Sequence, residues 1–222
     1  MRLRRRSEVS DETADDLDSD LDTDLEDDRG GSEPGSDVGA ATGPYDADEL
    51  PEDDPERVDL GSLLIAPEAG RELRLQVDEA SGVVQSVVLA AADGALELRA
   101  FAAPRNGDLW SEARPQIASE VAGRGGTATE REGRWGPELV CRVQVRTPDG
   151  KTGTQESRII GINGPRWLLR GTLLGKPATD VDGSSDWEDL LGRVAVRRGS
   201  QAMPVGEPLA VTMPPQARRV EG

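Results

Sequence analysis

The stretch IIGINGPRWLLRGTLL, residues 159–174, decides the fold because it predicts two apolar strands joined by a turn. Asn163 and Gly164 alone would predict a two-residue hairpin loop. Pro165 argues against that loop, because residue 165 would have to donate an N–H to Ile162 and proline has none. The sequence therefore predicts a longer loop, in which Ile162 lies opposite Trp167.

Alternation assigns the side chains of this stretch to two faces, and both registers keep the same assignment. The first face is apolar and carries Ile160, Ile162, Trp167, Leu169, Gly171 and Leu173. The second face carries Ile159, Arg166, Leu168, Arg170, Thr172 and Leu174. We expect Trp167 to lie in the core. Arg158 falls on the face of Trp167 and would need a partner if buried, for which Glu156 is the nearest candidate.

Two interpretations stay open for the arginines of the second face. They form either a solvated or ion-paired sheet surface, or a site that captures an anion or an acidic partner through the fixed donors of the guanidinium group. The other predicted strands carry further arginines. The candidate ligand-binding residues are therefore Arg99, Arg142, Arg166 and Arg170, and the sequence predicts no catalytic or metal-binding residue.

Residues 58–222 alternate between strand patterns and helix patterns. Strands are predicted at residues 60–66, 73–77, 83–91, 95–103, 139–145, 154–162 and 166–174. A helical stripe follows the fourth strand at Leu109, Ala113, Ile117 and Val121. Pro115 should kink this helix or mark a late start, and a second helix is predicted after Ser184 or Ser185. Short turns favour a mostly antiparallel sheet, so we predict an α+β domain with about two helices packed on the sheet.

The negative charge of the chain is concentrated at its N-terminal end. Residues 1–59 carry 22 acidic and 6 basic side chains, whereas residues 60–222 carry 21 acidic and 20 basic ones. A segment with so much charge and so few large apolar residues cannot repay the entropy of ordering. We therefore predict a disordered acidic region over residues 1–57, a single domain over residues 58–222, and an extended C-terminal segment over residues 199–222.

Composition excludes several classes of function. The chain has no histidine, which excludes Ser-His-Asp triads, Cys-His dyads and zinc sites that need histidine. Its one cysteine, Cys141, excludes an internal disulfide and favours a cytoplasmic location. No apolar run of the length of a secretory signal follows the basic start, and none is long enough to span a membrane. We predict no cofactor, and the prediction leans away from an enzyme.

Several blocks of the domain are distinctive, among them GPYDADELP, RVDLGSLLIAP, LRLQVDEASGVVQSVVL, GPRWLLRGTLLG and VRRGSQAMPVGEPLAVTMP. These blocks resemble an actinobacterial family of unknown function, domain of unknown function 3710. The resemblance covers about residues 44–220 and implies no activity or site residues. The order of strands and helices is also similar to that of photosystem-P-like domains, a likeness of fold that gives no function.

Three hypotheses of function follow from these patterns. The first is a cytoplasmic, non-enzymatic interaction or regulatory module, whose acidic tail engages a basic protein or covers an arginine-bearing face of its own domain. The second is a nucleic-acid-associated factor, in which the basic start RLRRR and exposed arginines contact phosphates. The third is an enzyme that uses paired carboxylates in a water-filled pocket. The sequence leaves the oligomeric state open.

Overall fold

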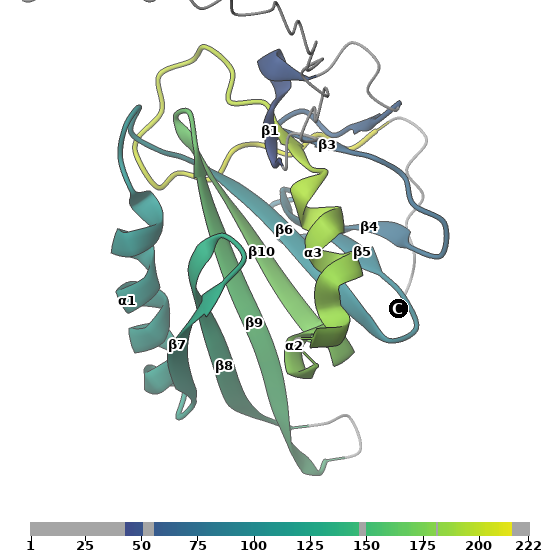
Figure 1. Cartoon of the computed structure of the whole chain (residues 1–222), viewed down its shortest axis with the longest axis vertical. Helices are drawn as coiled ribbons and strands as arrows, with labels where there is room; N and C mark the ends of the chain where they lie inside the picture. The colour runs from purple at the N-terminus through teal and green to yellow at the C-terminus, as the bar shows by residue number, and fades with distance from the viewer. Residues whose placement is uncertain (1–42, 51–55, 147–149, 181, 215–222) are drawn as a thin grey trace, which may run out of the picture. The chain divides into compact units, whose positions relative to one another are not determined.

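A seven-stranded antiparallel sheet forms the centre of the computed structural model, which describes residues 43–50, 56–146, 150–180 and 182–214 (Figure 1). The strand order is β4-β5-β6-β10-β9-β8-β7. The strands are β4 (Glu72–Val77), β5 (Val84–Ala90), β6 (Gly94–Ala102), β7 (Thr127–Gly133), β8 (Gly136–Arg146), β9 (Thr152–Gly164) and β10 (Trp167–Gly175). The predicted mostly antiparallel α+β fold is confirmed.

A smaller sheet of four short strands lies beside the larger one, in the order β1-β11-β3-β2. Its strands are β1 (Tyr45–Asp46), β2 (Val58–Asp59), β3 (Leu63–Ile65) and β11 (Ala195–Val196), and β1 pairs with β11 in parallel. Residues 43–50 therefore have regular structure within the region for which composition predicts disorder. The reason is specific bonding: the N–H of Tyr45 donates to the carbonyl of Val194 at 2.9 Å. Residues 1–42 and 51–55 of that region lie outside the described residues.

Helix α1 (Leu109–Gly123) follows the first three strands of the large sheet. It begins after its N-cap Asp108, well before Pro115, so a late start at the proline is wrong. Glycine ends the helix: Gly125 has a φ of +75°, and the N–H of Gly126 donates to the carbonyl of Val121 at 2.9 Å. The other helical segments are η1 (Ala47–Glu49), α2 (Lys176–Thr179), η2 (Asp182–Ser184) and α3 (Ser185–Gly192).

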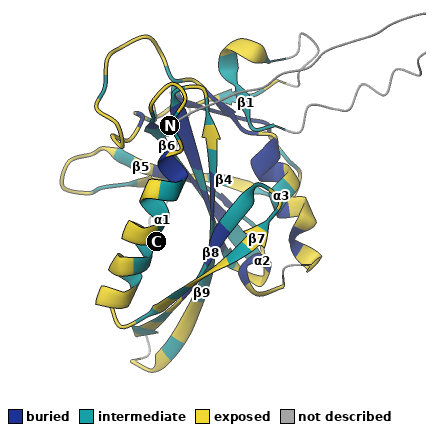
Figure 2. Cartoon of the chain, turned by 60° about the vertical axis from the view of Figure 1, so that its left-hand side comes forward, coloured by how far each residue is buried: buried dark blue, intermediate teal, exposed yellow. Residues whose placement is uncertain are grey.

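Helices cover the two faces of the large sheet and create two cores (Figure 2). On one face α1 packs against β7, β8 and β9. The core there contains Leu109, Trp110, Leu139, Cys141 and Leu168. On the other face α3 contributes Trp187, Leu190 and Leu191 to the larger core. Trp167 lies in this larger core as predicted, and its indole N–H donates to Asp46 Oδ2 at 2.9 Å.

The hairpin between β9 and β10 has a tighter turn than the sequence predicts. Trp167 pairs with Gly164 rather than with Ile162, so the loop is Pro165 and Arg166 alone. Proline takes the first central position of the turn, where its missing N–H has no consequence, and Arg166 takes the second with a φ of +65°. A φ above zero at that position is the mark of a type II turn. The predicted longer loop is therefore wrong, although the assignment of faces is confirmed because the register moves by two residues.

The C-terminal segment is hydrogen-bonded to the large sheet rather than lying free on the surface. The N–H groups of Gly206 and Leu209 donate to the carbonyls of Ala102 and Ala100, both at 2.8 Å, and Ala102 donates to Glu207 at 2.8 Å. These bonds lie along β6 beyond the end of its pairing with β5. Residues 215–222 of the predicted extended segment lie outside the described residues.

Candidate functional site

Two of the four predicted arginines meet on the large sheet. Arg170 on β10 is the direct register partner of Arg99 on β6, so both side chains leave the same face. This is the face of α1, which also carries Phe101 and Leu168. The guanidinium carbons of Arg99 and Arg170 lie 5.5 and 5.2 Å from the centroid of the Phe101 ring, within the range of a cation–π contact. Both guanidinium groups therefore contact the same aromatic ring.

The charges of this arginine pair are not neutralised by direct contacts. Among the described residues, no carboxylate lies within ion-pair distance of Arg99 or Arg170. Burial, followed by the neighbouring charge of Arg99, lowers the pKa of Arg170, and the more distant charges of Glu97 and Glu120 partly oppose this shift. The Nε–H of Arg99 is buried and has no acceptor among the described residues. The arrangement can accept an anionic group that bridges the two guanidinium groups.

The structure places the other two candidate arginines elsewhere. Arg142 on β8 points to the opposite face and forms an ion pair with Glu156 at 2.6 Å. Arg166 lies in the β9–β10 turn, where its carbonyl accepts from the N–H of Ala103 at 2.9 Å. The four arginines therefore do not form one site. Local patterns could not show that Arg99 and Arg170 meet, because β6 and β10 are separated in sequence by α1 and three strands.

A second charged cluster lies under α3, on the other face of the sheet. Arg158 is fully buried, and its Nε lies 2.7 Å from Oε1 of Glu138, which is 1% exposed. Glu138 also contacts Arg131 at 2.5 Å. Glu188 of α3 forms an ion pair with Arg158, and Ser184 Oγ accepts from Arg158 at 2.7 Å. The predicted partner Glu156 is wrong, because Glu156 is bound to Arg142 directly across the strand pair. The cluster's charges satisfy one another, so it fastens α3 to the sheet.

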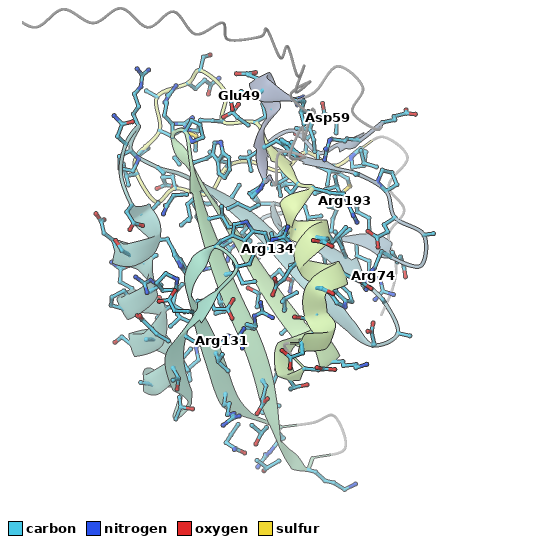
Figure 3. The ribbon with its side chains drawn as sticks, viewed as in Figure 1. Glu49, Asp59, Arg74, Arg131, Arg134 and Arg193 are labelled. Atoms are coloured by element: carbon cyan, nitrogen blue, oxygen red, sulfur yellow. The ribbon has the colours of Figure 1, made fainter. Side chains whose placement is uncertain are left out.

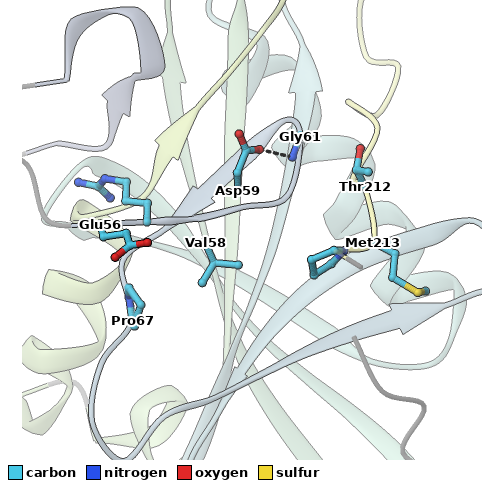
Figure 4. Close-up of a pocket in the computed structure, with 9 residues that line it drawn as sticks. Glu56, Val58, Asp59, Gly61, Pro67, Thr212 and Met213 are labelled. Carbon is cyan, nitrogen blue, oxygen red and sulfur yellow. Dashed lines mark hydrogen bonds between the residues drawn. The ribbon is translucent and has the colours of Figure 1, made fainter. Parts of the chain in front are cut away.

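A shallow pocket of about 560 Å³ opens beside the smaller sheet (Figure 4). Its lining includes Asp59, Val58, Pro67 and Met213. The Asp59 carboxylate is already occupied, since it accepts from the N–H of Gly61 at 2.8 Å and from Arg197 at 2.9 and 3.0 Å. These bonds, first that of Gly61, lower the pKa of Asp59. An acid held in its ionised form is a poor proton donor, so Asp59 is not placed to act as a general acid.

Metal binding and membrane insertion find no support in the part of the chain that the structure describes. Within those residues no cluster of three or more Asp, Glu, Cys or His side chains is placed to hold a metal ion. No helix there is both long and apolar enough to cross a bilayer.

Comparisons with known proteins add a family but no function. No curated protein is significantly similar to the chain. Among solved structures, the solution structure of cyanobacterial PsbP (CyanoP) from Synechocystis sp. PCC 6803 is 15% identical, with 63% of this chain and 91% of that chain covered. Its TM-score of 0.36 is too low to support an argument. A family model matches residues 43–220, and the chain therefore belongs to the family described as Protein of unknown function (DUF3710).

Proposed function

We propose that the chain is a non-enzymatic protein-interaction module, and that its Arg99–Arg170 pair binds a carboxylate-bearing segment of a partner protein. One observation carries the proposal: two arginines are direct cross-strand partners, and no carboxylate among the described residues contacts either of them. Like charges placed opposite each other destabilise a sheet. A ligand anion that contacts both guanidinium groups would remove this repulsion.

The surroundings of the pair favour a single acidic group over a polyanion. Glu97 lies two residues before Arg99 on the same strand face, and Glu120 of α1 is near enough to act on Arg170. Nucleic-acid binding depends on neutralising several consecutive phosphates with a basic surface. Two arginines flanked by glutamates suit a short acidic motif better. Nucleic-acid binding is therefore the alternative that the experiment below must distinguish.

The acidic N-terminal segment is the second part of the proposal. Residues 1–59 carry 22 acidic and 6 basic side chains and would attract a basic protein over a long range. Such binding should weaken steeply with salt, because charges separated by more than about 8 Å are screened at physiological ionic strength. We place the module in the cytoplasm of an actinobacterium, since its single cysteine favours a reducing compartment and the family resemblance suggests the source.

Side-chain NMR of the full-length chain tests the arginine site directly. The probe is a capped hexaglutamate peptide, and the signals are the Nε–Hε resonances of the arginines. We expect the peptide to shift the resonances of Arg99 and Arg170. Arg170→Gln should weaken binding roughly tenfold or more, as expected for loss of a charge-assisted hydrogen bond. Arg99→Gln should have the same effect, which guards against a folding defect in one variant.

Arg142→Gln is the matched control, because Arg142 is a strand arginine of the same sheet that points to the opposite face. It should bind the peptide within about twofold of the unchanged chain. Equal losses in Arg142→Gln and Arg170→Gln would show a nonspecific charge effect and refute the site. Binding of a single-stranded oligonucleotide in preference to the peptide, with a linear dependence on log salt, would favour the nucleic-acid alternative.

A further inference from the structure

Strand β4 is an edge of the large sheet, and no described strand pairs with its outer side. The N–H of Ala91 donates to Gly94 across the β5–β6 hairpin, so the polar backbone groups of Val88 and Ala90 point the other way, toward β4. Their partners Arg74 and Glu72 turn their backbone groups inward. The N–H and C=O groups of Leu73 and Leu75 therefore point outward, and no described residue bonds to them. An edge of this kind can accept another strand.

The side chains of β4 do not block such pairing. Leu73 and Leu75 are half-buried on the face of α3, and a neighbouring strand would cover their exposed parts. Glu72 and Arg74 project from the opposite face, are 57% and 55% exposed, and form an ion pair at 2.6 Å. Arg74 lies on the side of the domain away from α1 (Figure 3). The strand has no proline and no lysine, which commonly protect natural edges.

We propose that the occupant of this edge is β4 of a second copy of the chain, paired antiparallel about a two-fold axis at Leu73. Charge selects this register. Glu72 opposite Glu72, or Arg74 opposite Arg74, would place like charges together and destabilise the pair. With Leu73 opposite Leu73, each Glu72 faces Arg74 of the other copy. The dimer then contains two pairs of opposite charges across the interface.

The backbone geometry supports the same register. Leu73 lies on the outward side of β4, so the two copies exchange both of its hydrogen bonds at the axis. Glu72 and Arg74 then fall at the non-hydrogen-bonded positions, where opposing Cα atoms are only about 4.5 Å apart and side chains interact best. The pairing joins two seven-stranded sheets into one continuous sheet. Pairing along a six-residue strand buries less surface than the roughly 1,600 Å² of a standard interface. The dimer should therefore be weak, and its population should depend on protein concentration.

Charge reversal combined with analytical ultracentrifugation of the full-length chain tests this pairing. The unchanged chain should show a monomer–dimer equilibrium across a wide concentration range. Glu72→Arg alone, or Arg74→Glu alone, converts two attractive contacts into two repulsive ones and should raise the dimer dissociation constant roughly tenfold or more. The double variant E72R/R74E should restore the original association.

Mixing the two single variants gives the sharpest result. One variant presents two arginines on this face of β4 and the other presents two glutamates. The mixture should therefore form a heterodimer at concentrations at which neither variant alone associates appreciably. Glu132→Arg, an exposed charge reversal on the opposite edge strand β7, is the control and should leave association unchanged. A chain that stays monomeric at all concentrations would refute the pairing. Failure of the mixture to associate, or a single reversal without effect, would equally overturn it.

Discussion

Arg158 shows how the fold neutralises a charge that it buries. The guanidinium is fully buried and contacts carboxylates from β8 and α3. Its place on the face of Trp167 was predictable from alternation alone, but its partner was not. Arg158 pairs in register with Val140, so Glu138 is its diagonal neighbour on β8, close enough for long side chains to meet. Glu188 comes from a helix whose position no local pattern defines.

Replacing this arginine should strongly destabilise the domain. Arg158→Met leaves Glu138, which is 1% exposed, with Arg131 as its remaining ion-pair partner among the described residues. Breaking a buried pair in this way costs about 3–5 kcal/mol, because a desolvated charge is left without full compensation. Urea denaturation measures the loss. Arg142→Met, which breaks the exposed pair with Glu156, should cost no more than about 1 kcal/mol. Equal costs for the two variants would contradict the structural role given to Arg158.

At the scale of elements, sequence patterns predicted the sheet face of each side chain better than they predicted which strands are adjacent. Side-chain alternation has a period of two, so the two-residue error in the β9–β10 register left the faces of the paired residues correct, whereas Arg166 lies in the turn and on neither face. The adjacency of β6 and β10 had no such signal, because these strands are not joined by a hairpin. Pro115 was misjudged in one respect: α1 begins at Leu109 and continues through the proline to Gly123, packed against β7 and β8.

The N-terminus of α1 makes a pH-dependent contribution to stability. Asp108 accepts from the N–H of Ser111 at 3.0 Å and from Asn163 Nδ2 at 2.7 Å. The bond from Ser111 is the main reason why the pKa of Asp108 lies below its ordinary value of 3.8. A lowered pKa in the folded state means that the stabilisation is complete above the ordinary value and is lost as the pH falls through the folded value.

Asp108→Ala should therefore cost about 1 kcal/mol at neutral pH, as for other N-cap aspartates, and less in acid. The free energies of unfolding of the two chains should converge as the pH falls below the ordinary pKa of an aspartate and through the lowered pKa of Asp108 in the folded state. Glu112→Ala, which alters a carboxylate in the same first turn, is the control for general charge effects. A difference that stays constant with pH would show that the ionised carboxylate of Asp108 is not the source of the stabilisation.

At the scale of the whole domain, segments from both ends of the described chain complete the cores. Asp46 of β1 accepts from the indole of Trp167, and Leu209 of the C-terminal segment lies in the larger core. The fold class was predictable because the strands of the large sheet are long enough to show alternation. The smaller sheet was predictable only in part: the strand predicted at residues 60–66 contains β3, whereas β1 and β2 contain two residues each and show no period.

The C-terminal segment should behave as part of the core rather than as a tail. Leu209 is 6% exposed, and its N–H is bonded to Ala100 of β6. Leu209→Ala should destabilise the domain by about 2–5 kcal/mol, as expected for truncation of a buried leucine. Val205→Ala, at a site 56% exposed in the same segment, should have little effect on the midpoint of thermal unfolding. Similar midpoints for both variants would show that the segment is dispensable.

The place of the Arg99–Arg170 pair has a consequence for synthesis and quality control of the chain. The two residues come together only when β10 pairs with β6, and α1 and the strands β7 to β9 lie between them in sequence. A nascent chain that ends before β10 has Arg99 but lacks its partner. A ligand that bridges the two guanidinium groups, as proposed above, would therefore bind only molecules in which β10 has paired with β6.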